Sequence, residues 1–139
     1  MEPAEITIGW REWLMLPGLG IDAIKAKVDT GARTSCLHTF ELETYHHQGE
    51  ERVRFGMHPF QKDTSQVVWC DCPVYEWRRI TDSGGHPEDR VIIVTDLLMA
   101  GRRWPIEVSL TNRETMRFRM LLGRTAMADV VVRPRASFL

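Results

Sequence analysis

Residues 24–32 carry the clearest structural pattern of the chain and read Ile24-Lys25-Ala26-Lys27-Val28-Asp29-Thr30-Gly31-Ala32. Apolar residues alternate with two lysines here, which is typical of a β-strand with one face in water. The strand then runs into an acid, a hydroxyl and a glycine, and glycine lets the backbone turn sharply. Taken alone, Asp29-Thr30-Gly31 is equally compatible with a simple strand-to-turn junction, because Asp and Gly are common turn residues.

The same alternation recurs along the chain. It predicts strands over residues 53–57 and 104–110, and apolar, β-branched runs predict strands over residues 67–74 and 91–94. Residues 6–8 and 12–16 are expected to form an opening pair of strands. Pro105 lacks a backbone N–H, so we expect its strand to lie at an edge, or Pro105 to lie on the wet side. Residues 40–60 are expected to form an inserted hairpin, and only residues 123–129 look helical. About eight short strands predict an all-β closed barrel with one short C-terminal helix, in a single domain, 1–139.

The totals exclude several function classes. The formal net charge is −1, from 18 Lys and Arg against 19 Asp and Glu, so no basic excess predicts a nucleic-acid partner. No window approaches the ~18 apolar residues of a membrane span. The acidic start of the chain lacks the features of a signal peptide, and Cys36, Cys70 and Cys72 are expected to be free thiols. Both features predict a cytoplasmic protein.

A second motif reads Met120-Leu121-Leu122-Gly123-Arg124, an apolar strand broken by Gly-Arg. Together the two motifs resemble the retropepsins, single-domain aspartic peptidases in which the Asp-Thr-Gly loop supplies the catalytic acid. The resemblance implies that Asp29 is that acid. It also implies that Gly123 supports the loop from beneath and that Arg124 ties its own turn to the body of the domain.

The resemblance gives roles to the residues beside Asp29 as well. Thr30 is implied to hydrogen-bond across two loops, with a local turn bond as the alternative. Gly31 is implied to present its backbone carbonyl to the substrate, and Ala32 to leave the cleft open through its small size. Arg33 directly follows the motif, where it can face substrate carboxylates.

Longer strings carry a closer resemblance that covers nearly the whole chain. Residues 9–14, 16–17, 24–35 and 119–126 are similar to a bacterial and archaeal family labelled ATP-dependent zinc proteases. Genes of that family often lie beside those of ATP-grasp glutamate ligases. Residues 40–100 are less diagnostic.

The residues do not support the ATP and zinc of that label. An ATP site of the common kind needs Gly-x-x-x-x-Gly-Lys-Ser/Thr, and the nearest glycine-rich run, Ser83-Gly84-Gly85, lacks the lysine. Catalytic zinc takes about three protein ligands, and the chain contains no His-Glu-x-x-His. Cys70 and Cys72 could form a metal site with a histidine only if the fold brought that histidine close to them. We therefore predict no cofactor and no metal, with a zinc-dependent protease as the alternative.

A single Asp-Thr-Gly run supplies only half of an aspartic peptidase site. One carboxylate cannot act as general base and general acid at once, whereas two held about 3 Å apart share one proton. No other acid of the chain lies in a similar context. Two-fold pairing must then bring Asp29 to Asp29 of a second copy, so we predict a homodimer.

Retropepsins close a hairpin flap over the substrate. Matching strands backwards from Gly123 predicts this flap as residues 67–80 with 90–97, tipped by residues 81–87. Ser83, Gly84 and Gly85 would then touch the substrate, although an ordinary exposed loop is equally compatible.

The association with glutamate ligases predicts acidic, glutamate-rich peptide or protein tails as the substrate. Five arginines can line a cleft and face such carboxylates, with at least half of them expected to be solvated surface residues. They are Arg33, Arg78, Arg79, Arg90 and Arg113. The sequence thus predicts a homodimeric aspartic endopeptidase. A zinc-dependent protease and a non-catalytic peptide-binding module of the same fold remain the alternatives.

Overall fold

The computed structural model describes residues 6–60, 63–81, 84–112 and 117–139. The secondary structure in this part of the chain is β1 (Ile6–Ile8), β2 (Arg11–Leu16), η1 (Pro17–Leu19), β3 (Ile21–Asp29), β4 (Ser35–His38), β5 (Glu41–His47), β6 (Glu50–Met57), β7 (Val68–Pro73), β8 (Glu76–Thr81), β9 (Pro87–Met99), β10 (Arg102–Thr111), β11 (Met120–Gly123), η2 (Arg124–Ala126) and β12 (Val130–Val132). The expected all-β class is confirmed. Neither short 3-10 helix, η1 or η2, has the length or apolar character needed to cross a membrane, and no other helix occurs in the described residues.

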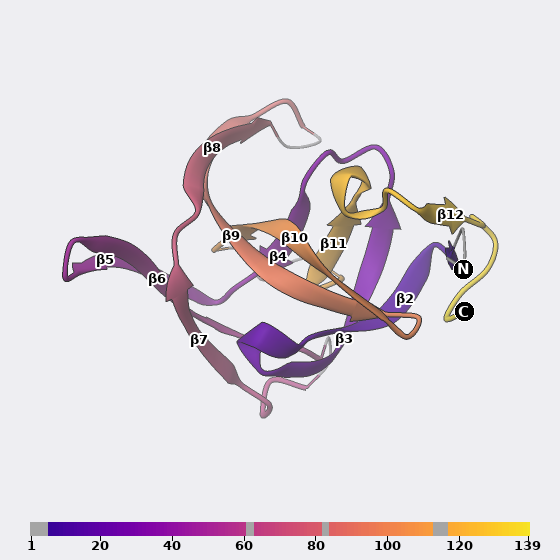
Figure 1. The fold of residues 1–139 in the computed structure, drawn as a ribbon, viewed down its shortest axis with the longest axis horizontal. Coiled ribbons are helices and arrows are strands. Elements are labelled where there is room, and N and C mark those ends of the chain that lie inside the picture. The colour runs from indigo at the N-terminus through magenta and orange to yellow at the C-terminus, as the bar shows by residue number, and fades with distance from the viewer. Residues whose placement is uncertain (1–5, 61–62, 82–83, 113–116) are drawn as a thin grey trace.

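The main sheet has the strand order β10-β4-β11-β3-β2-β9-β8. Because β9 also pairs with β10, the sheet curls back on itself, as Figure 1 shows. The join between β2 and β9 is the weakest one, with the single pair Met15 and Leu98 in register. Closure of the barrel between β2 and β9 therefore stays a prediction.

The alternation read in the sequence sets which residues enter the core. On β3, Ile24, Ala26 and Val28 are buried, and the lysines between them are more exposed, as expected. Similar rows on β2, β6 and β10 contribute to one apolar core. Burial of these apolar side chains is the main favourable contribution to folding.

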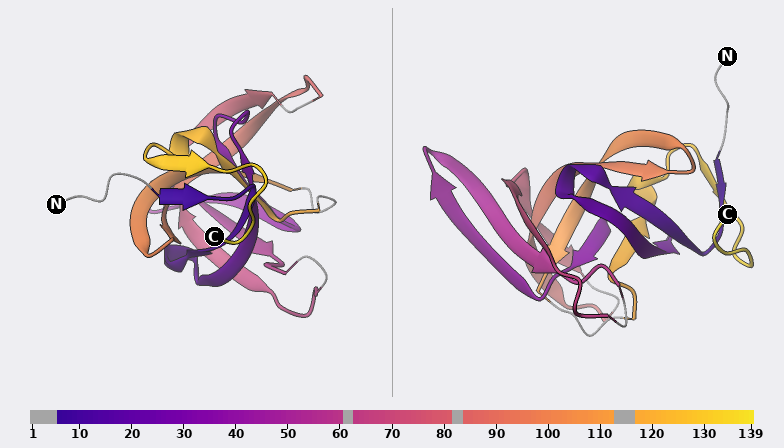
Figure 2. Two further views of the ribbon diagram at one scale, coloured as in Figure 1. Left: turned by 90° about the vertical axis from the view of Figure 1, so that its right-hand side faces the viewer. Right: turned by 90° about the horizontal axis from the view of Figure 1, so that it is seen from below.

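A second, three-stranded sheet has the order β5-β6-β7. Its β5–β6 hairpin projects from the rest of the molecule in Figure 1 and in the right-hand view of Figure 2. The hairpin turns at Gln48 and Gly49, whose φ angles are 53° and 80°. Two successive positive φ angles match the right-handed twist of antiparallel strands. The hairpin expected over residues 40–60 is confirmed, and its being an insertion stays a prediction.

Pro105 lies on a strand that has neighbours on both sides. It sits opposite Asp96 of β9, whereas β4 joins β10 only from Val108 onward. At Pro105 the strand is therefore locally an edge, and the residue is exposed. Proline has no backbone N–H to donate to a neighbouring strand, and at this local edge none is needed.

The expected helix over residues 123–129 is wrong in extent and type. Gly123 still pairs with β3, and Val130 already begins β12, which pairs in parallel with β1. The few residues between these strands form only the 3-10 turn η2. An α-helix needs more residues than this to repay its nucleation.

Candidate active site

The end of β3 places Asp29 at the start of a tight turn. The Asp29 carbonyl accepts a hydrogen bond from Ala32 N at 3.2 Å, and its carboxylate Oδ1 accepts one from Gly31 N at 3.0 Å. A Cβ on residue 31 would lie 3.3 Å from that same Oδ1, so glycine lets the backbone approach the carboxylate closely. Asp29 remains partly exposed, and Thr30 and Gly31 are exposed.

Strand β11 holds this turn from its other side. Gly123 lies opposite Asp29 in the parallel pairing of β11 with β3. Directly after it, Arg124 N donates to Ala32 O at 2.8 Å. Thr125 donates to Arg33 O twice, from its backbone N and, at 2.8 Å, from its hydroxyl.

The surroundings of Gly123 leave no room for a side chain. A Cβ there would lie 2.6 Å from the backbone carbon of Thr34 and 2.8 Å from Ser35 N. The Ser35 hydroxyl in turn accepts a hydrogen bond from Gly123 N at 2.9 Å. The β3–β4 loop and β11 are thus locked together backbone to backbone. Sequence reasoning missed Ser35 and Thr125, although a hydroxyl residue beside each motif was the available signal.

Thr30, Arg33 and Arg124 are exposed. Arg124 Nη1 donates to Gly31 O over 3.4 Å, the carbonyl expected to face substrate. Thr30 makes no side-chain hydrogen bond within the described chain, and Arg33 is exposed. The functional roles of these residues stay predictions.

A cleft of about 1290 Å³ opens beside Asp29. It exceeds the ~300–1,000 Å³ of typical small-molecule pockets, so it suits an extended ligand. Its lining comes from β3, β4, β8, β9, β10, β11 and the segments around them: Trp10, Lys27, Asp29, Gly31, Ala32, Arg33, Thr34, Cys36, His38, Arg78, Arg79, Ile80, Thr81, Arg90, Glu107, Thr111, Arg117, Phe118, Leu121, Arg124 and Thr125.

The charge of this lining is strongly positive. Seven of the residues are Lys or Arg, against the two acids Asp29 and Glu107. Four of the arginines expected at a cleft are among them, and Arg113 lies outside the described residues. Such a lining attracts anionic ligands.

The flap predicted from the sequence is partly wrong. Strands β8 and β9 do form a hairpin, but β7 pairs with β6 in the other sheet. The chain changes sheets between two adjacent residues, because Val74 N donates to Glu51 O of β6 and Tyr75 N donates to Ile92 O of β9. Gly84 and Gly85 are not among the cleft residues, and Ser83 lies outside the described residues.

The cleft also contains residues that the sequence did not single out. Cys36 and His38 on β4, and Thr111 at the end of β10, line it and are buried. All four residues of β4 are buried, so this strand lacks the alternation that marks a half-exposed strand.

The donors in the described residues do not fit zinc. No group of three or more His, Cys, Asp or Glu there is placed to hold a metal ion. Burial raises the pKa of Cys70 to about 12 and that of Cys72 to about 11. Both thiols are therefore protonated near neutral pH.

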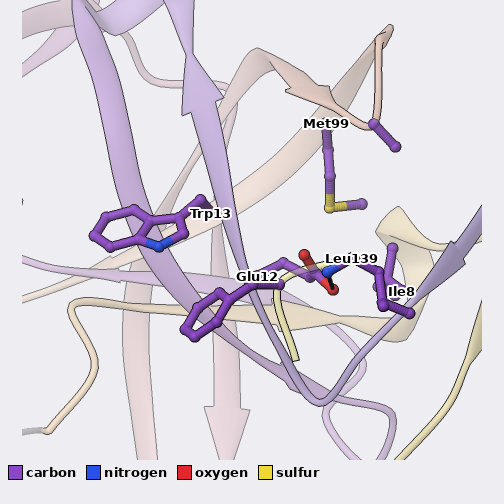
Figure 3. Close-up of a pocket in the computed structure, with 7 residues that line it drawn as sticks. Ile8, Glu12, Trp13, Met99 and Leu139 are labelled. Carbon is purple, nitrogen blue, oxygen red and sulfur yellow. Dashed lines mark hydrogen bonds between the residues drawn. The ribbon is translucent and has the colours of Figure 1, made fainter. Parts of the chain in front are cut away.

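Figure 3 shows a smaller pocket, of about 190 Å³, whose lining does not include Asp29. The buried Glu12 lies at this pocket, and its Oε2 accepts hydrogen bonds from Gly9 N at 2.7 Å and Leu139 N at 2.8 Å. Glu12 therefore joins residues from the two ends of the chain, which is a structural role.

Replacing Glu12 by alanine should lower the free energy of unfolding by about 2–4 kcal/mol, because two backbone N–H groups lose their acceptor. Denaturant unfolding at fixed protein concentration measures the loss. Glu12→Gln keeps an acceptor oxygen and should lose less. Equal stability of Glu12→Ala and the wild type would contradict this role.

The chain resembles several known proteins. Residues 7–139 match the profile of a family described as RimB-like, the retropepsin-like aspartic endopeptidase RimB. The fold is similar to that of a Legionella pneumophila protein of unknown function, with a TM-score of 0.78, 23% identity and 95% of each chain covered.

Curated relatives carry a different name. The chain is 46% identical over 129 residues to a probable alpha-L-glutamate ligase of Desulfotalea psychrophila, covering 93% of this chain and 28% of the relative. It is 44% identical to one of Parasynechococcus marenigrum, covering 96% and 29%. The chain therefore spans less than a third of the length of these relatives.

Proposed function

The chain belongs to the RimB-like family of retropepsin-like aspartic endopeptidases, and from this premise we propose that it hydrolyses peptide bonds as a homodimer. Asp29 of each copy would supply one carboxylate of the catalytic pair. The observation that carries this proposal is the placement of a partly exposed Asp29 beside a large cleft, on a turn held from behind by β11.

The chemistry follows from two carboxylates that share one proton. The ionised carboxylate takes a proton from water, which attacks the scissile carbonyl carbon. The protonated carboxylate donates a hydrogen bond to the carbonyl oxygen and stabilises the negative charge that develops there. The proton taken from water then passes to the amide nitrogen, the C–N bond breaks, and the tetrahedral centre collapses to a carboxyl group. The two carboxylates again share one proton when the amine and the acid leave.

Dimer formation would complete a site that one copy lacks. The exposed hydroxyl of Thr30 is available to bond across the pair of loops. Gly31 O is held by Arg124 over a long 3.4 Å contact, which a substrate N–H could replace or share. The exposure of Thr30 and Gly31 supports pairing through the Asp29 loops.

We propose acidic, glutamate-rich peptide or protein tails as the substrate. The excess of cationic over acidic residues in the cleft lining supports this class, because arginine binds carboxylates through well-matched geometry. The relatives' name points the same way, since a glutamate ligase adds the residue that such a peptidase would remove. The ligase activity of those longer proteins would lie in the region that this chain does not match.

Mixing wild type with Asp29→Asn tests the shared site. If each active dimer needs two aspartates, co-refolding equal amounts should leave about one quarter of the activity of the same total amount of wild type. Independently active monomers would leave about half. Steady-state cleavage of a glutamate-tailed peptide measures the difference.

The matched control is Asp22→Asn, because Asp22 is an exposed acid on the same strand, β3. Mixing with that variant should leave the activity undiminished. A linear fall of activity with the fraction of Asp29→Asn would overturn the homodimeric site.

A further inference from the structure

Two arginines face each other across the β8–β9 hairpin. Arg78 of β8 and Arg90 of β9 are directly opposite in the antiparallel register, and both line the cleft of Asp29. Residues directly opposite in such a pair extend their side chains from the same face, and like charges placed so are destabilising. Nearby negative charge is therefore needed to offset the repulsion between the two guanidinium groups.

Arg78 already has that charge. Its Nε donates to Glu76 at 2.8 Å, and its Nη2 donates to Glu107 at 2.9 Å. Two carboxylates from β8 and β10 thus fix the guanidinium and neutralise it. Arg78 forms a wall of the cleft with little capacity left for a ligand.

Arg90 is more buried and has weaker partners. It is 9% exposed, and its Nε donates to Glu88 at 3.1 Å. Among the described residues, its Nη1 hydrogen-bonds only to the Cys36 sulfur, at 3.6 Å, and sulfur is a weak acceptor. Nη2 makes no hydrogen bond within the described residues. No Arg90 nitrogen is among the described buried atoms that lack a partner, so the Nη end of this guanidinium is accessible from the cleft.

We propose that Arg90 is the specificity-determining residue for acidic side chains, and that the Nη1–Nη2 end of its guanidinium binds a carboxylate of the peptide. The planar guanidinium presents two parallel N–H donors, which match the two oxygens of a carboxylate. Glu88 occupies only the Nε side. This inference rests on the proposed function for the presence of a peptide in the cleft, and it adds the residue that reads the peptide.

Peptide binding to Asp29→Asn, which should not cleave, tests the subsite directly. Hexaglutamate and hexaglutamine are the two probes, because they differ in charge and not in length or shape. Adding Arg90→Gln should weaken hexaglutamate binding by between about 10- and 150-fold and leave hexaglutamine binding unchanged. Arg90→Lys should recover part of the loss, because lysine keeps the charge without the fork.

Glu88→Gln gives a test in the opposite direction. It removes the carboxylate that competes for Arg90, so hexaglutamate should bind more tightly. Glu88 is a partly exposed side chain, so this variant should fold even if Arg90→Gln does not. A purely structural ion pair between Arg90 and Glu88 predicts no such gain.

The ion pair of Arg103 with Asp96, at 2.8 Å, lies outside the cleft and provides matched controls. Arg103→Gln and Asp96→Asn make the same charge changes and should alter hexaglutamate binding much less. Equal losses on both peptides in Arg90→Gln, or no gain in Glu88→Gln beyond that of Asp96→Asn, would overturn the assignment.

The peptide-binding measurements test this inference independently of the proposed function. Absence of cleavage by the wild type would count against the peptidase and leave the binding comparison fully informative. Cleavage by the wild type with no change of Glu-over-Gln preference in the Arg90 variants would count against Arg90 alone.

Discussion

Asp29→Asn is expected to reduce peptide cleavage by a factor of at least about 10²–10⁴, the range lost when general acid–base catalysis is removed. Asparagine has the shape of aspartate but can neither take a proton from water nor share one with a second carboxylate. It keeps an oxygen that can accept the hydrogen bond from Gly31 N, which Asp29 Oδ1 accepts at 3.0 Å. The fold and its thermal stability should therefore change little.

The measurement is the initial rate of cleavage of a glutamate-tailed peptide, with Tm recorded on the same samples. Asp22→Asn, on the exposed face of β3, is the matched control and should keep full activity. Residual activity of Asp29→Asn near that of the wild type would exclude the aspartic mechanism.

Two further readouts separate the competing functions. A statine-type inhibitor, which mimics the water adduct, should block an aspartic peptidase, and a chelator should not. Loss of activity with the chelator alone would favour the zinc-dependent protease. Tight peptide binding by both wild type and Asp29→Asn, with cleavage by neither, would favour the binding module.

The strands that shape the molecule could be predicted because their side chains alternate. Ile24, Ala26 and Val28 are buried where the pattern places them, and residues 104–110 fall within β10. The position of Gly123 beside the Asp29 turn is expected from the resemblance of the two motifs to the retropepsins. In the structure Gly123 is paired with Asp29, which agrees with that expectation.

Other features depend on contacts that no local pattern encodes. Strand β4 is buried on both faces, so its residues, Cys36 and His38 among them, do not alternate. The flap prediction is partly wrong because it takes residues 67–80 as one arm of a hairpin, whereas Val74 and Tyr75 bond to different sheets. The facing of Arg78 and Arg90 depends on the register of the β8–β9 pairing, which no local pattern encodes.

Gly123→Ala is expected to lower the free energy of unfolding by about 3 kcal/mol, the upper end of the usual cost of overpacking. The new Cβ would meet backbone atoms of Thr34 and Ser35 at 2.6 and 2.8 Å, and the backbone cannot turn away as a flexible side chain can. The strands must separate where β11 supports the Asp29 turn. Cleavage should therefore fall in the fraction that remains folded as well.

Denaturant unfolding at fixed protein concentration measures the stability, and the cleavage rate per folded molecule measures the effect on the turn. Gly18→Ala is the matched control, because its Cβ would meet a single side-chain atom, the Thr95 hydroxyl, at 3.1 Å. That side chain can move by a few tenths of an ångström, so the control should lose much less. If Gly123→Ala matched Gly18→Ala in both measurements, β11 could not be the rigid support of the Asp29 turn. The alignment of the two carboxylates would then have to come from the dimer contact alone.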